Sequence, residues 1–325
     1  MQVLTRMAVA AMGLAAAVAA AHAQSYPARP VTIVVPFAAG GGSDLLARLV
    51  AQHLERRLGQ PFIVENRPGA GTTIAAMAVV RAAPDGHTLM QATSTTMAIN
   101  VTMLKSLAYE PLKDLVPVAV LTSSPFFLVV EPSFPAKSVA ELIALAKTKP
   151  KELNYGSSGP GSMHHLSTEL LQSLTGTSMT HVPYKATPPA MNDLLAGHIQ
   201  VLFGDSTSTL PMIRQGKVRA LAVTTTKRVE AAPDIPTVAE AGVPGFESAS
   251  WQMLVAPGQT PPQVVALLNR EVQSIFSDAT VRAELNRRGM GPQVTGSPEE
   301  LQTFVKAEIE RWSAIVRRAG LAASQ

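Results

Sequence analysis

The sequence predicts an α/β protein in which parallel sheets carry helices on both faces, divided into two domains. Short β-branched and apolar runs alternate with segments whose apolar residues recur every three or four positions. This order of strands and helices is typical of parallel sheets. With 325 residues, the chain is also long enough for two domains, at roughly 100–200 residues per domain.

The first series of elements begins with a buried strand over residues 31–35 and a helix over 45–58. It continues with a strand over 62–65, a helix over 72–82 and a strand over 88–92. Because strands joined through helices run in the same direction, this β-α-β-α-β order predicts a parallel sheet.

The pattern then resets, which predicts a second βαβ series. Two strands, 116–121 and 126–130, are separated only by Thr-Ser-Ser-Pro. The other predicted elements of this series are a helix over 139–147, a strand over 153–155, a helix over 162–174, a strand over 180–182, a helix over 186–196, a strand over 201–203, a short helix near Leu210 and a strand over 218–224.

The last part of the chain has a different character. One strand, 251–256, is followed by helices over 262–276, 280–288 and 298–318. Helices of this kind often pack back onto a preceding domain, so we interpret the first domain as discontinuous. It comprises residues 24–123 and 226–325 and encloses a second domain over 124–225.

The two crossovers between these domains are expected near Ser123 and near Thr225. Residues 1–23 precede both domains and read as a secretory signal. Arg6 is followed by an apolar run over 7–21 and by Ala21-His22-Ala23, which predicts export and cleavage after Ala23. An uncleaved anchor is the alternative, but a membrane span needs about 20 apolar residues.

Composition argues against several classes of partner and cofactor. Lys and Arg number 27 against 23 Asp and Glu, and no basic cluster is interleaved with aromatic residues, so no nucleic-acid partner is expected. Gly69-Ala-Gly71 is half of a dinucleotide fingerprint, but Ile74 stands where Gly or Ala is needed. We interpret it as a tight turn and predict no cofactor.

A glycine run lies between the first strand and the first helix. Gly40, Gly41 and Gly42 let the backbone approach a ligand closely. The helix that follows offers free N–H groups, which suit a carboxylate or a phosphate. Ser43 or Asp44 is expected to cap this helix. A plain strand-to-helix turn is an equally weighted alternative on the glycine run alone.

A second loop, 156–165, occupies the same relative position in the second domain, so the two loops could face each other across a cleft. It offers the hydroxyls of Ser157, Ser158 and Ser162 and the backbone N–H of Gly161. The loop approaches a nucleophile elbow, but Pro160 stands where the second glycine is required.

An esterase using Ser158 and His165 therefore stays open as an alternative. Metal binding is not expected, because the neighbours His164 and His165 point about 100° apart on a helix. We expect one of these histidines to face the cleft and the other to face solvent.

These loops belong to a longer set of motifs through which the chain resembles the Bug family of periplasmic receptors, the solute-binding components of tripartite tricarboxylate transporters. The resemblance runs over essentially all of the chain after residue 23, and the order and spacing of its motifs make it specific. They are Tyr26-Pro-Ala-Arg-Pro30, Val35-Pro-Phe-Ala-Ala-Gly-Gly-Gly-Ser-Asp44, Val64-Glu-Asn-Arg-Pro-Gly-Ala-Gly71, Tyr155-Gly-Ser-Ser-Gly-Pro-Gly-Ser162 with His165, His181-Val-Pro-Tyr-Lys185, Leu221-Ala-Val-Thr-Thr225, Pro236-Thr-Val-Ala-Glu-Ala-Gly242 and Ala256-Pro257.

The resemblance implies a type II periplasmic-binding-protein fold, in which two α/β domains joined by two crossover strands close on a small organic acid. It also implies a periplasmic location and a membrane permease partner with one large and one small subunit. We expect a monomer that is not an enzyme; a sensory protein that feeds a membrane kinase is a further alternative. The ligand-binding residues that the resemblance implies are Phe37, Gly40, Gly41, Ser43, Asp44, Thr93, Ser94, Ser157, Ser158, Gly161, Ser162, His165 and Asp205.

Overall fold

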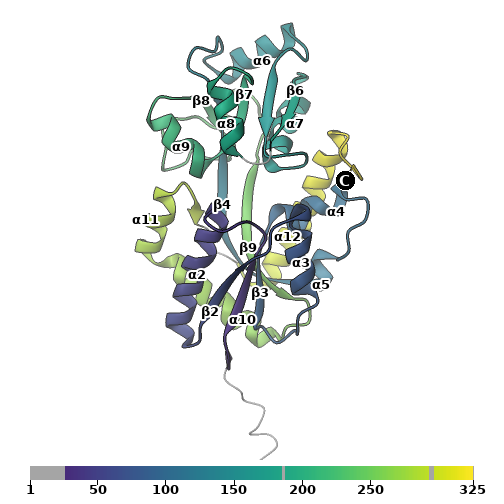
Figure 1. The fold of residues 1–325 in the computed structure, drawn as a ribbon, viewed down its shortest axis with the longest axis vertical. Coiled ribbons are helices and arrows are strands. Elements are labelled where there is room, and N and C mark those ends of the chain that lie inside the picture. Colours follow the sequence, from purple (N-terminus) through teal and green to yellow (C-terminus); the bar gives the residue numbers. More distant parts are fainter. Residues whose placement is uncertain (1–25, 185–186, 293–295, 325) are drawn as a thin grey trace, which may run out of the picture.

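The computed structural model describes residues 26–184, 187–292 and 296–324. They form two lobes stacked along the long axis of the molecule (Figure 1). The predicted signal over residues 1–23 lies outside the described residues. Within those residues, no helix has both the length and the apolar character needed to cross a membrane.

The first lobe contains the three parallel strands that the sequence predicts. β1 (Val31–Val35) lies between β2 (Phe62–Asn66) and β3 (Thr88–Thr93) and runs parallel to both. The sheet then becomes mixed, because β9 (Ala249–Pro257) pairs antiparallel with β3 and with β4 (Leu115–Val130). In this lobe the predicted parallel pairing is therefore confirmed for β1–β3, and the strands added to them are antiparallel.

Helices from both ends of the chain cover this lobe, as the sequence predicts (Figure 1). Apolar residues of α2 and α10 share one hydrophobic cluster with β1. The turn at 69–71 also leads into a helix, as expected. The elements are α2 (Gly42–Leu58), η1 (Ala70–Thr72), α3 (Thr73–Val80), α10 (Pro262–Ser277) and α11 (Ala279–Arg287).

The second lobe has a similar plan. β5 (Asn154–Ser157) runs parallel to β6 (Thr180–Pro183) and to β7 (Val201–Asp205). The second half of β4 pairs antiparallel with β7 and with β8 (Arg219–Val223). Its helices are α6 (Val139–Thr148), α7 (Met163–Thr175), α8 (Thr187–Leu195) and α9 (Ser206–Arg214).

β4 is one continuous strand through both lobes, where the sequence predicted two strands. Its first half pairs with β9 as far as Pro125, which lies opposite Ala249. From Phe126 onward it pairs with β7 and β8. Pro125 has no N–H to donate, and a proline is tolerated where pairing with one neighbour ends. The chain therefore crosses between lobes without a turn, near Ser123 as expected.

We expected the return crossing near Thr225, but it lies later in the chain. The backbone N–H of Val238 donates to Val223 at 2.9 Å, and that of Ser248 donates to Thr224 at 2.9 Å. The ring of Phe246 stacks on Phe203 of β7, with centroids 5.9 Å apart. Residues 225–248 therefore pack with the second lobe, and the chain returns along β9.

Four short elements were not predicted, because none is long enough to show a period. Three of them follow β3 and connect it to β4. The elements are the π-helix η2 (Thr95–Ile99), α4 (Asn100–Met103), α5 (Pro111–Asp114) and β10 (Gly291–Pro292), which pairs with β4.

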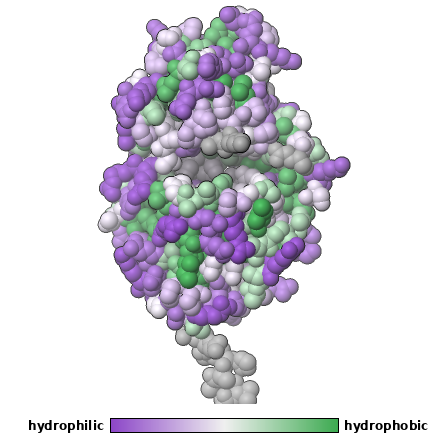
Figure 2. Space-filling view, in the orientation of Figure 1, coloured by the Kyte–Doolittle hydropathy of each residue, from purple (hydrophilic) through white to green (hydrophobic). Residues whose placement is uncertain are grey.

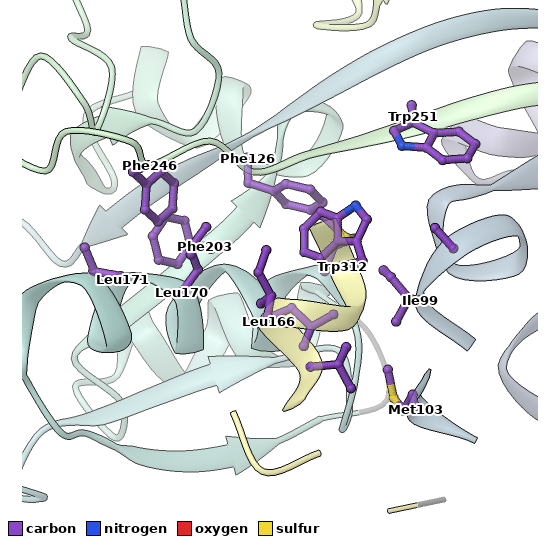
Figure 3. Close-up of a cluster of buried hydrophobic side chains, with 14 of the residues drawn as sticks. Ile99, Met103, Phe126, Leu166, Leu170, Leu171, Phe203, Phe246, Trp251 and Trp312 are labelled. Atoms are coloured by element: carbon purple, nitrogen blue, oxygen red, sulfur yellow. The ribbon is translucent and has the colours of Figure 1, made fainter. Parts of the chain in front are cut away.

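The C-terminal helix α12 (Pro298–Arg318) packs against both lobes. It begins at a capping box, in which Ser297 and Glu300 each accept a backbone N–H of the other. Trp312 is fully buried beside Phe126 and Leu166 of the second lobe and Ile99 of the first (Figure 3). One hydrophobic cluster consequently runs through both lobes and α12.

A buried carboxylate fixes α12 to β9, the strand along which the chain returns to the first lobe. Glu308 accepts the indole N–H of Trp251 at 2.6 Å and that of Trp312 at 2.9 Å. Arg311 donates to the other oxygen of Glu308 at 3.0 Å. Because all three donors converge on one side chain, the position of α12 against β9 is set by hydrogen bonds as well as by packing.

Candidate functional site

The two predicted loops lie at the junction of the lobes, where Figure 2 shows a hollow across the middle of the molecule. A Cβ added to Gly42, at the start of α2, would lie 3.4 Å from the hydroxyl of Thr207, at the start of α9. The same atom would lie 3.2 Å from Met290. The N-termini of α2 and α9 therefore meet across this junction.

Asp44 organises the first loop. Its carboxylate is 3 % exposed and accepts the backbone N–H of Gly40 at 2.9 Å, the amide of Asn66 at 3.0 Å and Arg48 Nε at 3.0 Å. The hydrogen bond from Arg48 holds the pKa of Asp44 below its usual range. Asp44 therefore stays ionised, and its hydrogen bond from Gly40 holds the glycine run against the first turn of α2.

The expected cap by Ser43 or Asp44 is wrong. The N-cap of α2 is Gly41, and it makes no side-chain hydrogen bond to the helix. The first backbone hydrogen bond of the helix runs from Leu45 N to Gly41 O at 3.0 Å. The side chain of Asp44 instead turns back to Gly40, so it leaves the first N–H groups of α2 free of a side-chain cap. Uncapped N–H groups at a helix start suit an anion.

The other predicted residues of the first lobe differ in exposure. Phe37 is 39 % exposed, and its carbonyl accepts the amide of Asn66 at 2.9 Å. Thr93 and Ser94, at the carboxyl end of β3, are buried, and the Thr93 hydroxyl contacts that of Thr96 at 3.3 Å. The hydroxyl of Ser94 has no hydrogen-bond partner among the described residues. It is a fully buried polar group that follows β3 directly.

Side chains beneath the second loop hold it in place. Ser157 is fully buried, and its hydroxyl lies 2.6 Å from Nε2 of His181. The backbone N–H of Gly161 donates to Nδ1 of His165 at 3.0 Å. Ser162 is the N-cap of α7 and accepts the backbone N–H of His165 at 3.4 Å. Four predicted site residues therefore have structural partners within their own lobe.

His165 and His181 form a stacked pair under this loop. Their rings lie 3.9 Å apart at an angle of 10°, and Tyr155 stacks on His181 at 4.9 Å. Burial and the neighbouring His181 lower the pKa of His165 to about 4, and burial also lowers the pKa of His181. Both rings are therefore neutral at neutral pH, with Nδ1 of His165 free to accept from Gly161.

Acidification should destabilise the protein through this pair. His165 has a folded pKa of about 4 against 6.5 for the free side chain, so between these values the unfolded chain binds more protons. Stability is then lost as the pH falls through that window, by up to roughly 3 kcal/mol. Urea unfolding of wild type and His165→Gln at pH 7, 5.5 and 4.5 measures this loss.

The glutamine variant keeps an acceptor for Gly161 but does not titrate, so its stability should fall less with acid. His198→Gln is the matched control, because His198 is 71 % exposed in its side chain. Equal pH slopes in wild type and His165→Gln would contradict the prediction.

Ser158 pairs with His164 and not with His165. Its hydroxyl lies 2.8 Å from Nδ1 of His164, whose Nε2 lies 3.1 Å from the hydroxyl of Thr187 and 3.9 Å from Oδ2 of Asp205. Both histidines are buried, so the expectation that one faces solvent is wrong. The structure therefore adds His164 to the candidate site.

Asp205 is the N-cap of α9, and this role explains its position. It accepts the backbone N–H of Ser208 at 3.0 Å and the hydroxyl of Ser208 at 2.9 Å. Its side chain remains about one-third exposed. The starts of α7, α8 and α9 are consequently connected by one polar chain through Asp205, Thr187, His164 and Ser158.

No group of three His, Asp or Glu side chains in the described part of the chain has the arrangement needed for a metal ion.

The two lobes offer different groups to a ligand. The second lobe contributes hydroxyls, histidine nitrogens and one carboxylate, and the first lobe contributes a glycine loop and a helix N-terminus. This combination can bind a small anionic molecule through hydrogen bonds alone.

Comparison with known proteins gives a consistent picture. Residues 46–321 match the model of the family described as the tripartite tricarboxylate transporter family receptor. The chain is 37 % identical over 313 residues to the protein BugT of Bordetella pertussis, and the match covers 96 % of this chain and 95 % of that protein.

Solved structures show the same similarity. An R. palustris protein with adipate is 41 % identical, has a TM-score of 0.82 and is matched over 91 % of this chain and 99 % of its own. MatC of Rhodopseudomonas palustris with bound malate is 38 % identical, with a TM-score of 0.78 and coverage of 90 % and 100 %. The periplasmic binding protein BugD is 34 % identical, with a TM-score of 0.79 and coverage of 91 % and 99 %.

Proposed function

This chain belongs to the tripartite tricarboxylate transporter receptor family, and from that premise we propose that it captures a small organic acid between its lobes and delivers it to a membrane permease. The supporting observation is that the uncapped start of α2 meets the start of α9, a second-lobe helix whose N-cap is Asp205, at the junction of the lobes. The related structures with adipate and malate support a carboxylate as the ligand.

In this proposal the first lobe holds the ligand carboxylate. The backbone N–H groups at the start of α2 are the donors. Asp44 shapes the loop from behind, since its carboxylate is already occupied by three donors. Hydrogen bonds to a charged group contribute about 1.5–3 kcal/mol each, so three or four support micromolar affinity after ordering costs.

The second lobe completes the site from the opposite side. Ser158, Gly161, Ser162 and Asp205 present polar atoms there, and Ser157 and His165 support the loop from below. The proposed ligand-binding set remains the thirteen residues named from the sequence, with His164 added. Binding at an interface between lobes couples the ligand to the lobe arrangement.

Closure of the lobes about β4 and β9 should compact the protein when the ligand binds. β4 pairs with strands of both lobes, and the chain returns from the second lobe to the first along β9. Small-angle scattering should therefore show a smaller radius of gyration on addition of a bound acid. An unchanged radius with binding confirmed by calorimetry would argue against closure.

A thermal-shift screen over some tens of organic acids, followed by calorimetry, tests the binding proposal. We expect a rise in melting temperature with one group of related acids. Export through residues 1–23, a periplasmic location and delivery to a permease with one large and one small subunit are parts of the same proposal. They rest on family membership and on the predicted signal.

A serine hydrolase is the competing function, because Ser158 contacts a histidine. The esterase hypothesis named His165 as that partner, but His165 Nδ1 is occupied by Gly161 N–H. Saturable hydrolysis of an ester that disappears in Ser158→Ala would contradict a purely binding role.

A further inference from the structure

In the polar chain from Asp205 to Ser158, each hydrogen bond has one donor and one acceptor that can be assigned. The assignment starts at Asp205, whose ionised carboxylate can only accept hydrogen bonds. Burial alone would raise the pKa of Asp205, but hydrogen bonds from His164, Thr187 and Ser208 hold it well below its usual range. An ionised carboxylate has no proton to donate. Every group that contacts Asp205 in this chain must therefore donate to it.

The negative charge of Asp205 sets the direction at His164. Nε2 of His164 lies 3.1 Å from the hydroxyl of Thr187 and 3.9 Å from Oδ2 of Asp205, so the carboxylate favours a proton on Nε2. We assign this tautomer from the network, and its Nδ1 is then an acceptor.

Ser158 is the last member of the chain. Its hydroxyl lies 2.8 Å from Nδ1 of His164 and must donate there. The side chain of Ser158 is only partly buried, so it offers its remaining lone pairs, and no proton, to a ligand. Asp205, about one-third exposed, likewise presents acceptors and a negative charge.

We infer that the bound acid carries a hydroxyl or an ammonium group at its second-lobe end, rather than a second carboxylate. A second carboxylate would meet the acceptors of Ser158 and Asp205 and the charge of Asp205, and neither residue has a proton to give it. This inference rests on the proposed function and specifies its ligand class. It separates this chain from its relatives solved with adipate and malate, which are dicarboxylic acids.

Calorimetry with two matched series of acids tests the inference on the exported form of the protein. The six-carbon series is hexanoate, adipate, 6-hydroxyhexanoate and 6-aminohexanoate. The four-carbon series is butyrate, succinate, 4-hydroxybutyrate and 4-aminobutyrate. At the better-fitting length, the hydroxy or amino acid should bind about tenfold or more tightly than both the dicarboxylate and the unsubstituted acid.

Two variants test the role of the chain itself. Ser158→Ala should reduce the preference of the wild type for the hydroxy or amino acid over the dicarboxylate, because it removes the acceptor that Ser158 presents and leaves only Asp205. His164→Arg replaces an acceptor by a side chain that only donates, so Ser158 regains its proton for the ligand and the preference should turn toward the dicarboxylate. If His164→Arg does not fold by circular dichroism, Ser158→Ala decides alone.

Ser277→Ala and His198→Ala are the matched controls, since both residues are exposed and lie away from the chain. A dicarboxylate that binds wild type as tightly as its hydroxy and amino analogues would overturn the inference and leave the proposed function standing. An undiminished preference in Ser158→Ala would also overturn it. Failure of all the acids to bind, in this series and in the wider screen, would overturn the proposed function and the inference with it.

Discussion

Replacing Asp44 with alanine should lower the affinity for the organic acid by at least about tenfold. The substitution leaves the N–H of Gly40 and the amide of Asn66 without their acceptor, although these bonds now hold the glycine loop against α2. The donors at the start of α2 would then lose their fixed positions. Calorimetry with the acid identified by the screen measures the loss.

Asp44→Asn should lower the affinity for the organic acid nearly as much, because the amide nitrogen of asparagine would have to face one of the three donors that Asp44 now accepts. Asp85→Ala is the matched control: Asp85 also pairs with an arginine, Arg29 at 2.7 Å, but it lies in the turn before β3 and its side chain is 43 % exposed. Wild-type affinity in a folded Asp44→Ala protein would remove the glycine loop from the binding site.

Replacing Trp312 with alanine should lower the free energy of unfolding by about 3–5 kcal/mol, the usual loss for a large buried aromatic residue. Trp312 has no exposed surface and lies among residues of both lobes (Figure 3). The variant leaves a cavity there and also removes one donor to Glu308. Urea unfolding followed by circular dichroism measures the change.

Trp312→Phe separates the two contributions in part, since it keeps a six-membered ring in the core but loses the indole N–H together with the rest of the five-membered ring. It should cost distinctly less than Trp312→Ala. Arg317→Ala, on an exposed position of the same helix, should leave the stability within about 0.5 kcal/mol of wild type. A loss below about 1 kcal/mol for Trp312→Ala would show that α12 does not tie the lobes together.

The strand and helix order could be predicted well because periodicity is a local property. Val31–Val35 is a continuous run of β-branched residues, and the helices that begin at Pro262 and Pro298 carry their start signals in the sequence. The two loops could be placed for the same reason, since each lies between a strand and a helix whose boundaries the sequence marks.

The course of the chain between the lobes could not be predicted as fully. Pro125 reads as a strand breaker, and only its position opposite the last residue of the β9 pairing makes it tolerable in β4. Residues 225–248 show no period, so nothing local indicated that Phe246 stacks on Phe203. Both features depend on partners far away in the sequence.

The role of His164 was missed for a similar reason. The sequence shows two adjacent histidines, and helix geometry alone separates their directions. Only the fold brings the start of α8 and the start of α9 to one of them, through Thr187 and Asp205. One local signal did point to this region. Ser162 and Asp205 are residue types that often cap helices, and each directly precedes a helix in the structure.

The position of β9 has a consequence for the order in which the protein can fold. β9 lies between β3 and β4 in the sheet, but it follows the whole second lobe in the sequence. A nascent chain that ends before residue 249 therefore cannot join β1–β3 to β4. Such long-range strand pairing is slow to form. Slow folding would keep the polypeptide unfolded during its proposed export across a membrane.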